Sequence, residues 1–457
     1  MKHLILLALL IYSVNASTQD MPAFKQLRYD EDYHFLKNDS TQSWYKNTKY
    51  APLSRDKNTY LSIGGEVRYQ YQWFKNQDWG KSIKDEDGFM LTRYLVHADF
   101  HAGKHVRTFV QLQSSFANGM EESPSPVDEN ELDLHQAFVD ASLVARNTTR
   151  LTLRVGRQEL IYGSQRLVAV RDGPNNRQSF DAAKLMYDHK DWKADLFYSH
   201  YVRAQQKIFD DGFNKNTRFW GTYFVKNKLP LIKNIDLYYF GIWKRTAMYD
   251  DATGKELRHV VGSRIWNSKG NWRYDIEGLY QFGSIENKRI DAWTFSVNTG
   301  YKFNDIKFKP EPGLKTEFIS GDKQYGDGSI QTFNPLFPRG SYFGLASLIG
   351  PVNLFDIHPS LAFELSDKLS LDMDCDIFYR QSIHDGIYGP NVALIYSGKN
   401  STNKFIGSQY SGDIIYIPVK FLYFRGEFTW FKTGAFLKDV GAEKDILFTS
   451  VTAQVKF

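Results

Sequence analysis

The most regular feature of this sequence is an alternation of apolar and polar residues over segments of about ten residues. In residues 61–73, LSIGGEVRYQYQW, the odd positions are apolar apart from Gly65, and the even positions are mostly polar or charged. Side chains of a β-strand point alternately to the two faces of a sheet, so this segment predicts a strand with one apolar and one polar face. Residues 90–100, 272–282 and 369–379 repeat the pattern.

The connections between these segments alternate between long and short. We count about 18 segments, each near the length that an outer-membrane strand needs. Long connections at 76–88 and 117–131 follow the first and third segments, and short ones at 102–104 and 145–147 follow the second and fourth. Outer-membrane barrels have short periplasmic turns and long outer loops. The pattern therefore predicts an all-β protein, a transmembrane antiparallel up-and-down β-barrel over residues 60–457.

Composition agrees with a barrel that is apolar outside and polar inside. Hydrophobic residues are 42% of the chain and aromatic residues 16%, which is aromatic-rich but polar on average. The last segment, 446–457, alternates and ends in Phe457. A soluble all-β protein such as a propeller is the alternative fold, but the sequence has no fixed-period repeat of the blade kind. The net charge of +5 comes from mixed charges, which gives no stripe for nucleic acid.

The N-terminus has the order of a secretory signal peptide. A basic start is followed by the apolar run 4–12 and by small residues before a predicted cut after Ala16. The run is about half of the ~20 residues that a spanning helix needs. We predict a signal peptide over 1–16 and an N-terminal periplasmic arm over 17–59, which either stays in the periplasm or threads partly into the pore. The single cysteine, Cys375, excludes an intramolecular disulfide.

Three stretches together resemble the alginate export family of outer-membrane porins. They are residues 156–185 (GRQELIYGSQRLVAVRDGPNNRQSFDAAKL), which we call the signature segment, residues 27–68, and residues 320–344. The resemblance implies a monomeric barrel of 18 strands in the outer membrane, with an electropositive lumen that passes an anionic polysaccharide or oligosaccharide, alginate in its best-known members. The terminal Phe457 resembles the signal that the barrel assembly machinery reads. Outer-membrane lipid is the remaining expected partner, and we expect no cofactor, metal or nucleic acid.

Arginines on the polar faces are the candidate lining of the conduit. A guanidinium is always charged and forms two hydrogen bonds with a carboxylate, so a row of arginines would attract uronates. Strand alternation predicts the following residues inside the barrel: Arg68, Arg93, Arg107, Arg154, Arg273, Arg380 and Arg425. Acidic residues such as Glu66 and Asp99 share these faces, so each arginine has an alternative role in cross-strand pairs of the wall.

The signature segment is the candidate constriction. It is too apolar between Leu160 and Val170 for a solvated loop, so we predict that it folds into the barrel mouth or extends its strands inward, and that it narrows the pore. Asp172 to Asn176 has the composition of a tight turn. Arg339, in the stretch 332–342, is assigned to a second gate. The constriction residues are Arg157, Arg166, Arg171, Asp172, Asn175, Asn176, Arg177 and Arg339.

Other functions remain as alternatives to polysaccharide transport. A general or small-anion porin would share the barrel and the arginines. A non-conducting adhesin or structural barrel would act through its outer loops. A barrel enzyme is not expected, because the sequence has no GxSxG motif. The histidines His97, His101 and His105 straddle a predicted turn and do not have the spacing of a metal site.

Overall fold

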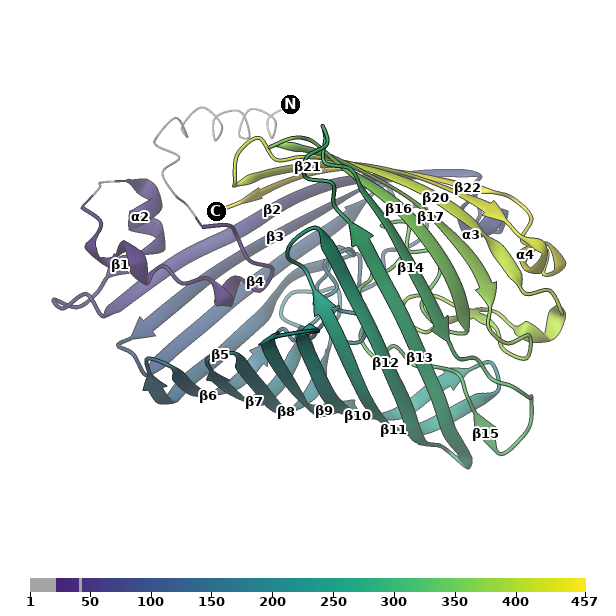
Figure 1. The fold of residues 1–457 in the computed structure, drawn as a ribbon, viewed down its shortest axis with the longest axis horizontal. Coiled ribbons are helices and arrows are strands. Elements are labelled where there is room, and N and C mark those ends of the chain that lie inside the picture. The colour runs from purple at the N-terminus through teal and green to yellow at the C-terminus, as the bar shows by residue number, and fades with distance from the viewer. Residues whose placement is uncertain (1–21, 41–42) are drawn as a thin grey trace.

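A closed antiparallel barrel dominates the computed structural model, which describes residues 22–40 and 43–457. The predicted signal peptide lies outside these described residues. Each barrel strand pairs with the next along the chain, and β22 pairs with β2 to close the wall (Figure 1). In the described part of the chain the 18 barrel strands are β2 (Thr59–Lys75), β3 (Glu86–Ala102), β4 (Val106–Asn118), β5 (Asn130–Arg146), β6 (Thr149–Gln158), β7 (Phe180–His189), β8 (Trp192–Arg203), β9 (Gly212–Leu229), β10 (Lys233–Tyr249), β11 (Ala252–Asn267), β12 (Trp272–Ile285), β13 (Lys288–Tyr301), β14 (Glu311–Ile319), β16 (Leu354–Ser366), β17 (Leu369–Arg380), β20 (Phe405–Tyr416), β21 (Leu422–Thr433) and β22 (Ile446–Lys456).

Smaller elements decorate this wall. The short strand β1 pairs with β2, β15 pairs in parallel with β13, and β18 and β19 form a separate hairpin. None of the helices in the described ranges is long and apolar enough to cross a membrane. The smaller elements are η1 (Arg28–Asp30), η2 (His34–Asn38), α2 (Trp44–Lys49), β1 (Ala51–Pro52), α3 (Gln77–Gly80), β15 (Ser329–Ile330), β18 (Ile387–Tyr388), β19 (Leu394–Tyr396), η3 (Gly398–Asn400) and α4 (Ala435–Asp439).

The strands have the alternating apolar and polar faces that the sequence predicts. On β3, Val96 is 50% exposed on the outer surface, whereas Arg93 is fully buried on the inner face. On β12, Tyr280 is exposed and its neighbour Gln281 is fully buried. Cys375 lies on β17 between the inward-facing Asp374 and Asp376 and is a free, partly buried thiol. These strands therefore present apolar side chains outward and polar ones inward, as the strand periodicity requires.

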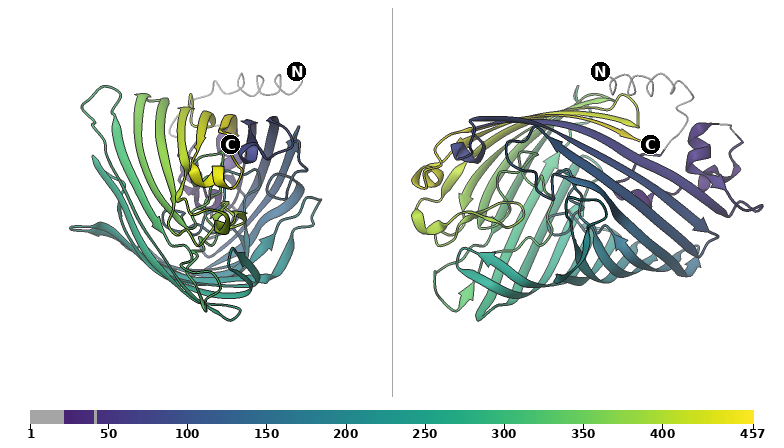
Figure 2. Two further views of the ribbon diagram at one scale, coloured as in Figure 1. Left: turned by 90° about the vertical axis from the view of Figure 1, so that its right-hand side faces the viewer. Right: turned by 180° about the vertical axis from the view of Figure 1, so that it is seen from behind.

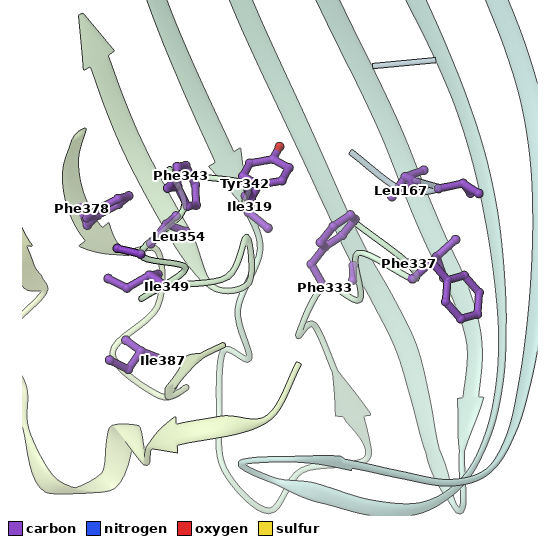
Figure 3. Close-up of a cluster of buried hydrophobic side chains, with 14 of the residues drawn as sticks. Leu167, Ile319, Phe333, Phe337, Tyr342, Phe343, Ile349, Leu354, Phe378 and Ile387 are labelled. Atoms are coloured by element: carbon purple, nitrogen blue, oxygen red, sulfur yellow. The ribbon is translucent and has the colours of Figure 1, made fainter. Parts of the chain in front are cut away.

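Two inserted segments fill much of the barrel interior (Figure 2). Residues 159–179, between β6 and β7, and residues 320–353, between β14 and β16, touch each other, and the amide of Phe337 donates to the carbonyl of Leu167. Apolar side chains from both segments pack against inward-facing rings of the wall (Figure 3). The second segment supplies Phe333, Phe337 and Phe343, which are nearly completely buried.

This internal packing corrects the expectation of a polar inner face. Phe180, Phe197, Phe219 and Phe240 on β7 to β10 point inward and are at most 3% exposed. Tyr162 of the signature segment stacks within this group, with its ring centre 5.5 Å from that of Phe197. Because these rings are covered by the inserted segments, this part of the inner wall is a hydrophobic core and the polar lumen lies elsewhere.

The N-terminal arm also enters the barrel. Arg28 donates hydrogen bonds to the carbonyls of Gly65 on β2 (2.8 Å) and of Phe457, which directly follows β22 (2.9 Å). Tyr29 is 4% exposed and packs edge-on against Phe109 and Phe138 of the inner face. The part of the arm around Arg28 and Tyr29 thus threads into the pore, whereas α2 and β1 lie at the rim, where β1 pairs with the start of β2 (Figure 1).

Candidate pore-lining site

A water-accessible cavity of about 560 Å³ lies inside the barrel between the inserted segments and one side of the wall. The wall contributes side chains from β2, β16, β17 and β20 to β22, and the inserted segments contribute residues around Asp172 and Arg339. The N-terminal arm contributes Gln26. The charged and titratable residues of this lining are Arg68, Asp172, Arg339, His358, Asp374, Asp413, Arg425 and Lys456.

Most of the predicted lumen arginines face inward but are held by carboxylates of the wall. Each of four has a neighbouring acid within ion-pair distance: Arg93 with Glu66 (2.6 Å), Arg107 with Asp99 (2.7 Å), Arg154 with Asp140 (2.7 Å) and Arg273 with Glu311 (2.9 Å). The geometry therefore matches the alternative role, in which cross-strand pairs stabilise the wall. Of the seven predicted arginines, Arg68 and Arg425 line the cavity.

These two arginines differ in what binds them. Arg425 is paired with Asp413 at 2.7 Å and with Glu427 at 2.6 Å. Arg68 donates to the backbone carbonyls of Asp172 (2.7 Å) and Pro174 (2.9 Å), so it fixes the turn of the signature segment to β2. Neither guanidinium is presented to the cavity without a protein partner.

Arg380 is buried at the end of β17 and holds a loop. Its guanidinium donates to five backbone carbonyls of residues 383–403, including those of Ser401 (2.7 Å) and Asn403 (2.6 Å). It also lies 4.1 Å from the centre of the Phe436 ring. The sequence placed Arg380 among the conduit residues, and the structure corrects this to a residue that anchors the 381–404 connection.

The turn of the signature segment is fixed deep inside the barrel by side chains from several strands. Asp172 accepts from Arg93 at 2.7 Å and lies 3.7 Å from Arg177. The Asn175 amide donates to three backbone carbonyls, and the side-chain oxygen of Asn176 accepts from Gln113 at 3.0 Å. These bonds show that Asn175 and Asn176, which the sequence assigned to the constriction, hold the turn in place.

The charge of Asp172 is stabilised by this surrounding. Desolvation by the barrel interior raises the Asp172 pKa, but the guanidinium groups of Arg93, Arg177 and Arg68 more than offset it. The net effect is a pKa well below the ordinary value for aspartate, so the side chain is ionised at neutral pH.

Two further arginines of the signature segment are buried ion-pair partners. Arg166 lies 3.0 Å from Glu317 and 3.4 Å from Glu277, which belong to different strands, and it donates to the Tyr342 hydroxyl. Arg177 lies 2.9 Å from Glu159 at the start of the same inserted segment. Both residues fasten the segment in place and do not line the cavity.

Arg157 was assigned to the constriction, and the structure corrects this assignment. It lies on β6, on the same face as Val155, which is 52% exposed on the outer surface. Its guanidinium bonds with Asp181 across the neighbouring strand β7 at 2.9 Å. The error came from treating the whole signature segment as a loop, whereas its two ends continue β6 and β7.

Two basic side chains in the cavity lining have no acidic group of the described residues within ion-pair distance. Arg339, at the tip of the second inserted segment, is exposed to the cavity, and its backbone amide donates to Gln165. Lys456 comes from the inner face of β22. Among the described residues neither side chain forms an ion pair or hydrogen bond. Lys456 was missed by the sequence analysis, although it continues the polar alternation of Thr452 and Gln454.

Arg171 is the remaining predicted constriction residue. It has a left-handed backbone with φ of 56° and a partly exposed side chain, and its Cγ approaches Gly340 of the second inserted segment. The guanidinium has no ion pair or hydrogen bond within the described ranges of the chain. It is a further basic group inside the barrel, next to the cavity lining.

The closed barrel with inserted segments and an internal cavity defines a protein of the outer-membrane porin class. The family model described as alginate export matches residues 59–445, so the chain belongs to the alginate export family. This confirms the resemblance, the strand count and the outer-membrane location that the sequence predicted. No curated protein sequence matches the chain.

Solved structures of porins have the same fold. A BenF-like porin from Pseudomonas fluorescens Pf-5 has a TM-score of 0.59 at 8% identity, covering 87% of this chain and 98% of that one. OpdO from Pseudomonas aeruginosa has a TM-score of 0.57 at 11% identity, covering 87% and 97%. OccK2 (OpdF) from the same species, solved in complex with glucuronate, has a TM-score of 0.55 at 11% identity, covering 87% and 96%.

Proposed function

We propose that this porin passes anionic oligosaccharides or polysaccharides of the uronate type through the internal cavity. The observation that carries the proposal is the pair of unpaired cations, Arg339 and Lys456, in the cavity lining. Because the predicted lumen arginines are held by wall carboxylates or, for Arg68 and Arg380, by backbone carbonyls, these two groups are available to a passing carboxylate. Membership of the alginate export family and the glucuronate named for the similar OccK2 structure support the same class of solute.

The two inserted segments are the proposed constriction. The first segment is fastened to the wall by the ion pair of Arg166 with Glu317, and the second by the hydrogen bond that the Tyr342 hydroxyl donates to Glu317 at 2.7 Å. The tips of the two segments, at Asp172 and Arg339, meet the cavity. A carboxylate that moves through such a water-filled constriction gains only ~1 kcal/mol from each unit-charge contact. Weak and repeated contacts of this kind favour passage over capture. One chain supplies the whole closed wall, so the proposed conduit is a monomer, and Phe457 is the proposed signal for the barrel assembly machinery.

The test is single-channel recording of the refolded protein in a planar bilayer under a salt gradient, with and without oligouronate. We expect an anion-favouring reversal potential and current that oligouronate blocks. Arg339→Gln should shift the reversal potential toward cations and weaken the block about fivefold, since one contact is worth ~1 kcal/mol. Arg150→Gln removes the same charge from the exposed start of β6, away from the cavity lining, and should leave both unchanged.

The outcomes separate this function from its alternatives. Anion-selective current that oligouronate does not block would replace the proposal with a small-anion porin. Cation-selective current would reject the role of Arg339 and Lys456. A barrel that never conducts would reject transport and favour an adhesin or structural barrel.

A further inference from the structure

Three side chains with metal-binding atoms meet on two neighbouring strands of the inner wall. Asp356 and His358 are two residues apart on β16 and therefore share a face. The strands β16 and β17 lie side by side in the wall (Figure 1), and the pairing of Ile357 with Ile377 places His358 opposite Asp376. One oxygen or nitrogen atom from each of the three side chains lies within 4.8 Å of the other two. Alternation in two strands is thus enough to build a compact group of two carboxylates and one imidazole.

The Asp356 carboxylate is buried without a partner. The residue is 0% exposed, and neither of its oxygens has a hydrogen bond. Buried carboxylates in folded proteins are nearly always bonded, because an ionised group without a partner costs several kcal/mol (roughly) to bury. The imidazole Nδ1 of His358 and Oδ1 of Asp376 lie 2.5 Å apart, but the pair lacks hydrogen-bond geometry. The free atoms of all three residues therefore converge on one point.

Neighbouring cations are already engaged elsewhere. Lys315 is the residue of the neighbouring strand β14 that pairs with His358. Its ammonium group lies 3.0 Å from the carboxylate of Glu317. Arg166 is also shared by Glu317 and a second acid. A fourth carboxylate, Asp374, lies 3.6 Å from Nε2 of His358. Acidic groups thus outnumber the basic groups around the three residues, and the charge that would balance Asp356 has to come from a bound cation or proton.

We propose that Asp356, His358 and Asp376 bind a divalent transition-metal ion, with Zn²⁺ as the representative. Zinc sites commonly combine imidazole nitrogen with carboxylate oxygen, and three protein ligands leave a further position open. Calcium and magnesium prefer ligand sets made of oxygen alone, so the histidine selects against them. Gln409 donates to the other oxygen of Asp376 at 3.2 Å, which orients that ligand as outer-sphere partners do.

A metal ion bound here would lie beside the conduit, because His358 and Asp374 line the cavity. A dication would neutralise the two carboxylate ligands, and an open coordination position would face passing anions. This inference goes beyond the proposed transport of uronates and does not require it. Metal binding can be measured on a barrel that fails to conduct, so the two proposals can fail separately.

The test is metal content of the full-length folded barrel in detergent. The protein is stripped with a chelator, dialysed against Zn²⁺ and analysed by mass spectrometry, and its affinity is measured by calorimetry. We expect one Zn²⁺ per barrel. Asp356→Asn and His358→Gln each remove one ligand with little change in shape and should weaken binding at least about tenfold. Asp372 lies on β17, as Asp376 does, but outside the group of three. The variant Asp372→Asn should therefore bind Zn²⁺ with the wild-type affinity.

Circular dichroism of each variant checks that the barrel is folded, and the two ligand variants provide independent tests. Wild-type protein that retains no Zn²⁺ would overturn the proposal and leave a proton as the balancing charge. Equal affinity in all variants would also overturn it, because binding would then occur elsewhere. Preference for Ca²⁺ over Zn²⁺ would reject the assignment to a transition metal.

Discussion

Single arginines inside this barrel have roles that depend on the nearest carboxylate. Arg93 is fully buried between Glu66 and Asp172, whereas Arg339 faces the cavity with no acid within ion-pair distance. Strand alternation predicts that Arg93, on β3, points inward. It predicts nothing for Arg339, which lies outside the strands. Whether an inward arginine serves the wall or the solute follows from the cross-strand register, which the sequence does not specify.

The buried pair of Arg93 and Glu66 provides a stability prediction. Their side chains are 0% and 4% exposed, so Arg93→Met would leave the Glu66 carboxylate in the interior without its ion-pair partner. We expect the free energy of unfolding to fall by about 3–5 kcal/mol. Urea unfolding of the barrel in detergent measures the change. Arg273→Met is the matched control, because its pair with Glu311 is 39% and 20% exposed and such pairs contribute about 0–1 kcal/mol. Equal losses in the two variants would contradict the prediction.

The carboxyl group of Asp322 makes one inserted segment sensitive to pH. Burial raises the Asp322 pKa from 3.8 to about 7. The folded segment therefore binds this proton more tightly than the unfolded chain does. The stabilisation is fully present below the unfolded pKa and is lost as pH rises through about 7. We expect proteolysis within residues 320–353 to become faster between about pH 5 and pH 8.

The control for this pH effect is Asp322→Asn, which cannot ionise. Its proteolysis rate should vary less with pH than that of the wild type. Asp385, which accepts a hydrogen bond from the amide of Asp322 at 2.9 Å, has its own pKa raised by burial to about 6. Some pH dependence should therefore remain in the variant. An unchanged pH profile would show that Asp322 does not govern the segment.

At the scale of elements, strands were predictable and the packing of the inserted segments was not. Strand alternation is a local pattern, and on β12 it separates lipid-facing from lumen-facing residues correctly. On β8, however, adjacent apolar residues lie on opposite faces, with Leu196 59% exposed and Phe197 3% exposed. The partners that cover Phe197 come from the distant signature segment, and no local pattern reveals such a contact. The apolar run in that segment was the one signal of its burial.

The N-terminal arm gives a prediction about an element. Tyr29 donates from its hydroxyl to the carbonyl of Glu159 at 2.8 Å, so it ties the arm to the start of the signature segment. Tyr29→Ala should release the arm from the lumen and increase single-channel conductance. Phe35→Ala is the control, because Phe35 belongs to the same arm but is 55% exposed. If both variants conduct as wild type does, the arm does not obstruct the pore.

At the scale of the whole molecule, closure of the barrel brings its first strand, β2, against the last residues of the chain. The amide of Gly65 donates to the carbonyl of Phe457 at 2.9 Å, and the amide of Phe457 donates back to Gly65 at 3.0 Å. Gly65 is the one exception among the apolar odd positions of its strand. The ring of Phe457 occupies the place that a side chain at this position would take. The interruption in the sequence pattern therefore marks the seam of the barrel.

Substitution of Gly65 tests how closely the seam is packed. A Cβ atom there would lie 2.5 Å from the backbone oxygen of Leu95 and 2.6 Å from Cζ of Phe457. Either β2 or the terminal ring must move, and we expect Gly65→Ala to cost about 1–3 kcal/mol, seen as a lower midpoint of thermal unfolding. Gly412→Ala is the matched control on β20, where the nearest atom, the backbone oxygen of Asp372, would be 3.9 Å away. Equal midpoints for the two variants would mean that β2 and Phe457 move apart at little cost. The contact between them would then contribute little to the stability of the barrel.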